Sequence, residues 1–449
     1  MNWRKPIIQL LLKASRRRIL KHLHEINKVN RQSGEDIIAY QRQRLCKMLM
    51  FAAQNVPYYT EILRDAGVVT GNDQVNLDRF RSIPPLTKDL IRSEGQRLYS
   101  RDYESRGYYE NTSGGSTGEP VSFIQDREYF DWNVAGKLYF KSQAGQEIGD
   151  AELRLWGSER DLKRDGEKLS IRLRNWLYNR TDVNAFRMTG EDMAEALELL
   201  DQKKPTWIEG YVQSLYELAR FAEERDHIVH SPRGILATAG VLQKPVEKLL
   251  ERVFRCSVFN RYGSREVGDV ACSCEVGDGL HVCQWSHYIE ILDDNMNPVS
   301  DGETGRLFIT LLTNHSMPLI RYEIGDLAVP AYNVACPCGR KTPLLEKIVG
   351  RRVGVFRTRD GTIVDGEYFT HLFYPLGWVR RFQVIQRDYC DIDVYIVPSE
   401  PPETEDIESI RADIQKIMGR NCEVDFHFVD EVAPSPSGKH LYTISEVDR

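Results

Sequence analysis

The chain has 449 residues and a net charge of −6, with 41% hydrophobic and 28% charged residues. This composition is typical of a soluble globular enzyme and excludes a fibrous or disordered chain, and the length favours two or three structural units. The slightly acidic balance gives no reason to expect nucleic acid as a partner. No secretory signal is evident, and the nine cysteines favour a cytoplasmic protein with free thiols or metal ligands.

The first 24 residues predict a basic amphipathic helix. Lysines and arginines lie between apolar residues at helical spacing, namely Ile7, Ile8, Leu11, Leu12, Ile19 and Leu23. We favour a helix packed on the body of the protein with a solvated basic face. Peripheral contact of residues 1–24 with an anionic membrane is the alternative. No run reaches the roughly 20 apolar residues of a membrane span.

Residues 36–53 continue a helical pattern that ends before Pro57. Thr87 is a candidate cap for a helix over 88–92. We therefore predict a helical segment over residues 1–55, followed by an α/β domain over 56–350.

Helical and strand-like segments alternate between residues 128 and 238, as in a layered α/β domain. Buried strands are predicted over 153–157, 206–211 and 234–238. Because loops at the ends of such strands commonly bind ligands, we take the residues there as candidates for a ligand pocket: Trp156, Tyr211, Thr238, Ala239 and Gly240.

Residues 288–320 read as strands and hairpin turns, which predicts a small β subdomain over about 270–345. Residues 351–449 combine short strands with one helix over 406–418 and are long enough for a separate domain. The expected fold class is α/β: a large layered N-terminal α/β domain with a small β subdomain, and a small α+β C-terminal domain.

The segment from Asn111 to Pro120 has the composition of a phosphate-binding loop. Three glycines let the backbone bend around an anion, and four hydroxyl side chains add donors. It is neither a Walker loop nor a dinucleotide-binding glycine motif. Its candidate phosphate-binding residues are Ser113, Gly114, Gly115, Ser116, Thr117 and Gly118.

Three further motifs follow in order, at residues 260–266 (NRYGSRE), 321–326 (RYEIGD) and 437–439 (SGK). Together with the glycine-rich loop, they resemble the signature elements of the adenylate-forming superfamily, which contains acyl-CoA synthetases. Within it, the chain is most similar to the branch of phenylacetate–CoA ligase and coenzyme F390 synthetase, including capsule-cluster relatives.

The resemblance implies roles at the matched positions. Glu266 would hold Mg²⁺, Asp326 would accept hydrogen bonds from the ribose hydroxyls, and Lys439 would stabilise charge at the α-phosphate. The remaining implied ATP-binding residues are Asn260, Arg261, Tyr262, Gly263 and Arg351. The resemblance also implies an acyl pocket at the strand ends and a C-terminal domain that is mobile about a hinge just after Arg351. The chain departs from the family pattern where Val121 follows Pro120 in place of lysine, and where Val353 replaces the charged residue usual at the hinge.

Two Cys-x-Cys pairs and a histidine can supply the four ligands of a tetrahedral zinc. The spacing resembles zinc-bearing members of the branch, which implies Cys274, His281, Cys336 and Cys338 as ligands of a structural Zn²⁺. Cys272 competes for the first position, and free cysteines in strands are the alternative.

These features predict an AMP-forming ligase that uses ATP to convert a carboxylic acid to an acyl-adenylate. Transfer to CoA is the first expectation. An amine acceptor, perhaps in capsule or surface-polysaccharide assembly, and AMP transfer to an acceptor are alternatives, and a degenerate nucleotide-binding scaffold is the non-enzymatic one. The sequence leaves the acid, the acceptor and a homodimer open.

Overall fold

The computed structural model describes residues 2–15, 17–71, 74–113, 121–156, 169–184, 190–276, 279–351, 355–359, 363–373, 376–432 and 441–447. Several predicted features therefore lie outside the described residues: the loop from Gly114 to Gly118, the hinge position Val353 and the catalytic candidate Lys439. Among the described residues, no helix combines the length and the apolar character that crossing a bilayer requires.

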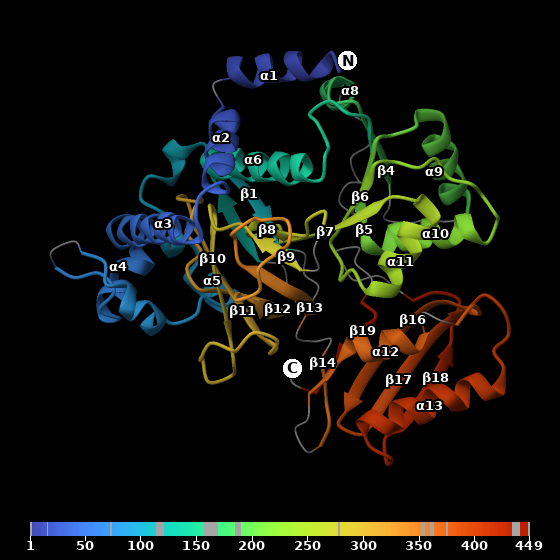
Figure 1. The fold of residues 1–449 in the computed structure, drawn as a ribbon. Coiled ribbons are helices and arrows are strands. Elements are labelled where there is room, and N and C mark those ends of the chain that lie inside the picture. Colours follow the sequence, from blue (N-terminus) through green and yellow to red (C-terminus); the bar gives the residue numbers. More distant parts are fainter. Residues whose placement is uncertain are drawn as a thin grey trace.

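The N-terminal segment is built from helices and short 3₁₀ turns (Figure 1). Side-chain caps explain where several begin, because Ser33 accepts a hydrogen bond from the Asp36 amide and Thr87 from that of Leu90, the latter as predicted. The helices are α1 (Arg4–Ala14), α2 (Ile19–Val29), α3 (Gly34–Asn55), α4 (Pro57–Asp65) and α5 (Lys88–Glu94), with 3₁₀ turns η1 (Leu77–Ser82), η2 (Gly95–Leu98) and η3 (Tyr103–Arg106).

The prediction of one continuous basic helix is wrong, because α1 and α2 are separate helices. The chain turns where Asp131 of helix α6 (Arg127–Gln143) binds it: its Oδ2 accepts from the Arg18 amide at 2.8 Å, and its Oδ1 lies 2.8 Å from Nε of Arg17. A carboxylate 113 residues away in sequence thus overrides the local helical periodicity.

A mixed sheet of eleven strands forms the body of the protein, in the order β10-β11-β12-β13-β9-β8-β7-β6-β5-β3-β4. Strands β4, β3, β5, β6 and β7 are neighbours in the sheet and run parallel. On the other side of β7, each strand from β8 to the edge strand β10 is antiparallel to its neighbour. The predicted β subdomain is therefore continuous with the parallel strands. The strands are β3 (Glu152–Trp156), β4 (Arg180–Asn184), β5 (Trp207–Tyr211), β6 (Gly234–Thr238), β7 (Ser257–Ser264), β8 (Gly268–Cys272), β9 (Leu280–Val282), β10 (His287–Leu292), β11 (Gly305–Leu311), β12 (Tyr322–Ala331) and β13 (Leu344–Arg351).

Helices cover the parallel strands, as an α/β layer requires. Leu155, Ile208 and Ile235 of the sheet are fully buried in one apolar core with the helices on one side. A separate hairpin is formed by the two strands on either side of the glycine-rich segment. These elements are α8 (Leu169–Leu177), α9 (Gly190–Lys203), α10 (Val212–Glu223), α11 (Lys244–Phe254), and the hairpin strands β1 (Tyr109–Thr112) and β2 (Ser122–Gln125).

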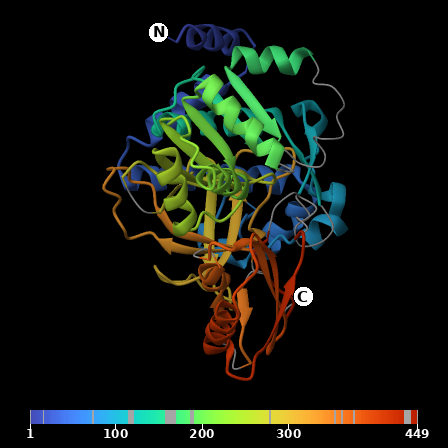
Figure 2. The ribbon, with the colours of Figure 1, turned by 90° about the vertical axis from the view of Figure 1, so that its right-hand side faces the viewer.

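The C-terminal unit has its own apolar core and a sheet in the order β18-β17-β16-β19 (Figure 2). Its elements are β14 (Val355–Arg357), β15 (Ile363–Asp365), α12 (Gly366–Phe373), β16 (Val379–Asp388), β17 (Asp391–Pro398), α13 (Thr404–Met418), β18 (Glu423–Phe428) and β19 (Thr443–Ser445). The expected fold class is confirmed by this large α/β body with a small C-terminal α+β unit.

Helix α10 of the α/β body contacts the C-terminal unit. The Arg220 guanidinium donates to the carbonyls of Val379 and Gly377 at 2.6 and 3.2 Å, and Arg381 lies 3.2 Å from the Glu217 carboxylate. These contacts hold the C-terminal unit beside the helix that follows strand β5.

Candidate active site at the strand ends

The glycine-rich segment is closed at its base. The Ser113 amide donates to the Val121 carbonyl at 2.9 Å, and the Val121 amide donates back to Ser113 Oγ at 2.9 Å. Ser113 is buried with an exposed fraction of only 1%. Its hydroxyl therefore serves the closure of the loop, whose remaining predicted phosphate-binding residues lie outside the described part of the chain.

The hairpin is fixed to the second motif. The Gln125 side-chain amide donates to the carbonyls of Arg265 and Glu266, at 2.8 and 3.2 Å. These bonds join residues 140 or more apart in sequence. Gln125 was not predicted as a site residue, and nothing in its local sequence distinguishes it.

The second and third motifs are joined by two side-chain contacts. Tyr262 Oη donates to Asp326 Oδ2 at 2.6 Å, and Tyr322 Oη lies 3.4 Å from Glu266 Oε1. Glu266 is 4% and Asp326 8% exposed, so both carboxylates are largely shielded from solvent. Glu266 and Asp326 are thereby held in one region, as their implied roles require.

Two glycines shape this region. A Cβ atom on Gly263 would lie 2.4 Å from the Gly268 carbonyl oxygen, so the turn between β7 and β8 admits no side chain there. Gly268 itself has a φ of 78°, in the left-handed region. The predicted residue Gly263 therefore has a packing role, which fixes the path of the chain between Tyr262 and Glu266.

Asn260 and Arg351 are placed by strand pairing. The Asn260 amide donates to Ser273 Oγ and its carbonyl accepts from the Ser273 amide, both at 2.8 Å. The backbone of Arg351 is opposite Asp326 in the pairing of β13 with β12. Both residues therefore lie on strands that border the Tyr262–Asp326 contact.

Arg261 has contacts of a different kind. Its guanidinium is buried, with Nη2 2.5 Å from Glu209 Oε1 and Nε 3.6 Å from Asp269 Oδ1. These carboxylates occupy the side chain, so its contacts support a structural role and not the expected contact with nucleotide.

Arg261 belongs to a cluster of buried ions between the sheet and helix α6. Lys141 pairs with Glu152 and, at 2.8 Å, with Glu209. Burial raises the pKa of the Glu209 carboxyl, but Lys141, Arg261 and Arg154 outweigh it and hold this pKa well below its usual range. Glu209 is therefore ionised and compensated within the fold.

The predicted acyl-pocket residues come together at the carboxyl ends of the parallel strands. The Trp156 and Tyr211 rings lie 4.7 Å apart, and Tyr211 pairs with Thr238 across β5 and β6. Thr238 Oγ1 donates to the Arg261 carbonyl at 2.9 Å. Ala239 has a φ of 58° and turns the chain there.

Gly240 continues this turn against helix α10. A Cβ atom on Gly240 would lie 3.0 Å from Val212 Cβ, which is tight. The five candidate residues thus lie at or just after the carboxyl ends of strands β3, β5 and β6, beside strand β7, which carries Tyr262.

The four predicted zinc ligands also meet. One ligand atom from each of Cys274, His281, Cys336 and Cys338 lies within 4.8 Å of the others. Burial lowers the pKa of His281 to about 4, so its imidazole is neutral and able to bind a metal.

The orientation of the His281 ring supports the same conclusion. His281 Nδ1 lies 2.9 Å from Thr342 Oγ1, which leaves Nε2 directed at Cys338 Sγ, 3.3 Å away. Such a fixed ring orientation is usual for metal-binding histidines. Three thiols and one imidazole at this spacing suit tetrahedral zinc. Cys272, the competitor, packs instead among apolar residues with Trp207 and Phe259.

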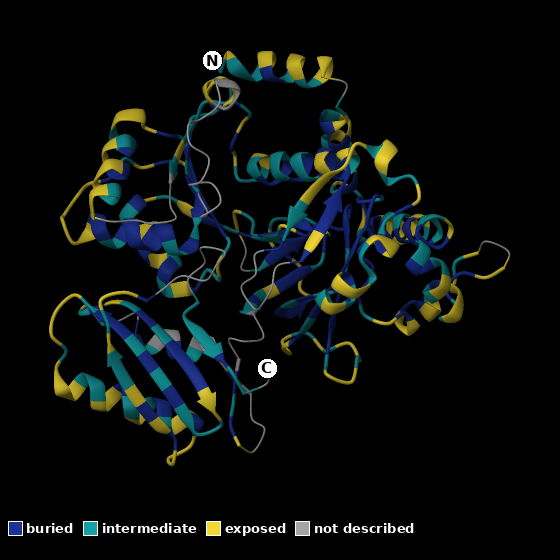
Figure 3. Ribbon diagram, turned by 180° about the vertical axis from the view of Figure 1, so that it is seen from behind, coloured by how far each residue is buried: buried dark blue, intermediate teal, exposed yellow. Residues whose placement is uncertain are grey.

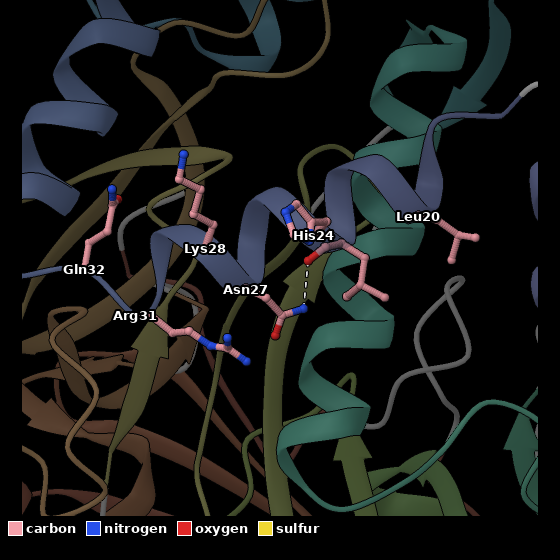
Figure 4. A pocket seen from close by; sticks show the side chains of 7 residues that line it. Leu20, His24, Asn27, Lys28, Arg31 and Gln32 are labelled. Atoms are coloured by element: carbon pink, nitrogen blue, oxygen red, sulfur yellow. Dashed lines mark hydrogen bonds between the residues drawn. The ribbon is translucent and has the colours of Figure 1, made fainter.

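The structure also has a hollow along α2 (Figure 4). Its lining comes entirely from one helix and the turn after it: Leu20, Leu23, His24, Asn27, Lys28, Arg31 and Gln32. None of the predicted site residues lines it, so the convergence of motifs at the strand ends remains the candidate site.

Comparison with known proteins gives a consistent result. Residues 356–446 match the family described as the CapK C-terminal domain. Protein CapK of Staphylococcus aureus is 22% identical over 96% of this chain and 94% of its own length. The phenylacetate-coenzyme A ligase of Thermus thermophilus is 26% identical over 80% of each chain.

A solved structure of 2-hydroxyisobutyryl-CoA ligase, in the postadenylation state, superposes with a TM-score of 0.73 at 19% identity. It covers 94% of this chain and 91% of that one. Fold and relatives together define an enzyme of the AMP-forming ligase class, as the motifs predict. More narrowly, the chain is similar to Protein CapK and to phenylacetate-coenzyme A ligases over most of its length, and it shares the fold of the 2-hydroxyisobutyryl-CoA ligase structure.

Proposed function

We propose that the chain activates a carboxylic acid with MgATP and transfers the acyl group to CoA. The observation that carries this proposal is the hydrogen-bonded series from Gln125 to Glu266, from Glu266 to Tyr322, and from Tyr262 to Asp326. It supports the proposal because it connects residues of the second and third motifs with one another and with strand β2, which follows the glycine-rich segment.

In the first step, a carboxylate oxygen of the acid bonds to the α-phosphorus of ATP, and the bond to the β-phosphate breaks to release pyrophosphate. The glycine-rich loop would hold the β- and γ-phosphates. Glu266 would bind Mg²⁺, which neutralises phosphate charge when bound. Tyr262 would stack on adenine while its hydroxyl orients Asp326 toward the ribose.

In the second step, the CoA sulfur attacks the acyl carbonyl and AMP leaves. Lys439 serves the first step, because an ammonium close to the α-phosphate stabilises the charge that develops there. The proposed domains are the helical segment 1–55, the α/β domain 56–350, which carries the ATP-binding candidates, and the mobile unit 351–449, which carries Lys439. Since the reaction consumes ATP and CoA, we place it in the cytoplasm.

Zinc has a separate, structural role in the proposal. Cys274, His281, Cys336 and Cys338 fill all four positions of a tetrahedral ion, so no position would be left for substrate. The ion would tie the start of β9 to the loop between β12 and β13 and thereby support the strand that carries Asp326.

An amine acceptor in place of CoA is the second candidate. The basic character of residues 1–24 favours it, since such a segment suits work near a membrane. In that case, the same adenylate would form an amide, in capsule or surface-polysaccharide assembly. AMP transfer without release is the third candidate.

The test is release of pyrophosphate and AMP from MgATP with a panel of carboxylic acids, each with and without CoA. Acid-dependent pyrophosphate release that turns over only with CoA is the expected result. Adenylation that is indifferent to CoA would favour the amine acceptor, and no release with any acid would contradict acid activation.

A substitution assigns the chemistry to the C-terminal unit. Lys439→Ala should reduce adenylate formation by roughly a hundredfold or more, because it removes a charge that acts in the transition state. ATP binding should change little. Lys416→Ala, an exposed lysine on α13 of the same unit, is the matched control. Equal loss in both variants would remove the role assigned to Lys439.

A further inference from the structure

Helix α1 directs much of its apolar surface outward. Trp3, Ile7, Leu10 and Leu11 have exposed fractions of 48, 41, 66 and 49%, whereas Ile8 on the opposite side is buried. The spacing of these four residues places them on one helical face. The exposed side of α1 is visible in Figure 3.

Helix α8 extends this apolar surface. Leu173 and Trp176 are 61 and 57% exposed. The Trp176 ring centre lies 6.0 Å from that of Trp3, and the Arg4 guanidinium lies over both rings. We call these six apolar residues the α1–α8 face: Trp3, Ile7, Leu10, Leu11, Leu173 and Trp176.

The α1–α8 face is fixed to the body of the protein. The side-chain amide of Asn2 donates to the Ile148 carbonyl at 3.0 Å, and Lys5 pairs with the Glu147 carboxylate at 3.0 Å. These partners precede strand β3, so the face lies at the amino ends of the parallel strands. Figures 1 and 2 show α1 and α8 at the end of the molecule opposite the C-terminal unit.

The surroundings of the face are strongly basic. Residues 1–24 contain seven lysines and arginines and no aspartate or glutamate, although the whole chain has a net charge of −6. Arg172 and Arg174 add exposed positive charge on α8. On α2, Lys21, His24 and Lys28 are exposed at helical spacing. Lys5, Arg17 and Arg18 pair with carboxylates of the body, and the remaining cations leave the apolar side chains with a net positive surrounding.

We propose that the α1–α8 face binds an anionic phospholipid surface. Leucine and isoleucine would enter the boundary of the acyl chains, and tryptophan rings favour the interfacial layer. Lysine and arginine would contact the anionic headgroups. The strand ends, with the candidate active site, would point away from the membrane, so that the C-terminal unit keeps its access to water.

The charge argues against a second copy of the chain as the occupant. A two-fold contact through this face would bring two basic helices together, since each copy contributes the same surface. Like charges at such short range oppose association. An anionic lipid surface removes this conflict and matches both properties of the face.

The test is co-sedimentation with vesicles of phosphatidylcholine alone, or of phosphatidylcholine with phosphatidylglycerol. We expect binding only to the second, weakened by high salt. The double substitution of Leu10→Asp with Trp176→Asp should reduce the bound fraction roughly tenfold or more. Ile417→Asp is the matched control, at an exposed position on α13 of the C-terminal unit, which lies at the opposite end of the molecule from the face (Figure 1).

The substituted side chains are exposed, so unchanged thermal unfolding will confirm that the variant is folded. Failure to bind anionic vesicles, or equal binding by all three proteins, would overturn the proposal. A dimer that the double substitution dissociates, without vesicle binding, would instead assign the face to a second copy. Pyrophosphate release in solution is measured without vesicles, so its outcome is independent.

Discussion

The hydroxyl of Tyr262 donates a hydrogen bond of 2.6 Å to the carboxylate of Asp326. The two residues come from motifs 64 positions apart. The bond fixes the orientation of a carboxylate whose implied partners are two ribose hydroxyls, and it does so from the residue proposed to stack on adenine.

The first prediction concerns this bond. Tyr262→Phe keeps the ring but removes the donor, so the KM for ATP should rise roughly tenfold, as expected for a hydrogen bond to a charged group. The KM for the acid should change little. Steady-state kinetics with each substrate varied will separate the two effects. Tyr332→Phe, at an exposed tyrosine, is the control, and an unchanged KM for ATP would contradict the orienting role.

The second prediction concerns the four-ligand cluster. Elemental analysis of purified protein should find about one zinc per chain. Cys336→Ser should lose most of it and lower the midpoint of thermal unfolding, because metal binding and folding are coupled. Cys46→Ser, outside the cluster, should retain the metal. A stable wild-type protein free of metal would rule out the zinc site.

The residues proposed for these two sites could be selected from the sequence, whereas the contacts around them could not. Motif order was enough to select Glu266 and Asp326, because their spacing follows a known family. The position of the end of strand β8 distinguishes Cys274 from its competitor Cys272. Cys272 is the last residue of the strand and packs in an apolar core, whereas Cys274 follows the strand and lies with the other proposed ligands.

Other features depend on contacts that carry no local signal. The break between α1 and α2 depends on Asp131, and the anchoring of Glu266 depends on Gln125. Arg261 lies inside a recognised motif, yet its carboxylate partners, Glu209 and Asp269, are known only from the folded chain. The helix break, the Gln125 contact and the partners of Arg261 could not be predicted, because each depends on residues far apart in the sequence whose types do not indicate the contact.

The third prediction tests the buried ions. Glu209→Gln removes the carboxylate that Lys141 and Arg261 share and leaves them only Glu152 and Asp269 as partners. It should reduce the free energy of unfolding by roughly 3 kcal/mol. Urea unfolding at neutral pH measures this change. Glu224→Gln, which alters an exposed pair with Arg220, should change it by about 1 kcal/mol or less. Similar effects of the two substitutions would mean that the buried cluster is not coupled to stability.

The fourth prediction concerns pH. Burial lowers the pKa of His287 to about 4, against an ordinary value of 6.5. The ring is held between Ser286 Oγ, 2.9 Å from Nδ1, and the Val267 carbonyl, 2.8 Å from Nε2. Between these two pH values, the unfolded chain takes up a proton that the folded chain does not.

The contribution of His287 to stability is therefore fully present above about pH 6.5 and decreases as the pH falls toward 4, by roughly 3 kcal/mol in all. Urea unfolding at several pH values should show a shallower decline for His287→Gln than for the wild type. His24→Gln, on the exposed side of α2, should keep the wild-type slope. A slope that is unchanged in His287→Gln would mean that other groups, such as the buried carboxylates, determine the acid sensitivity of the fold.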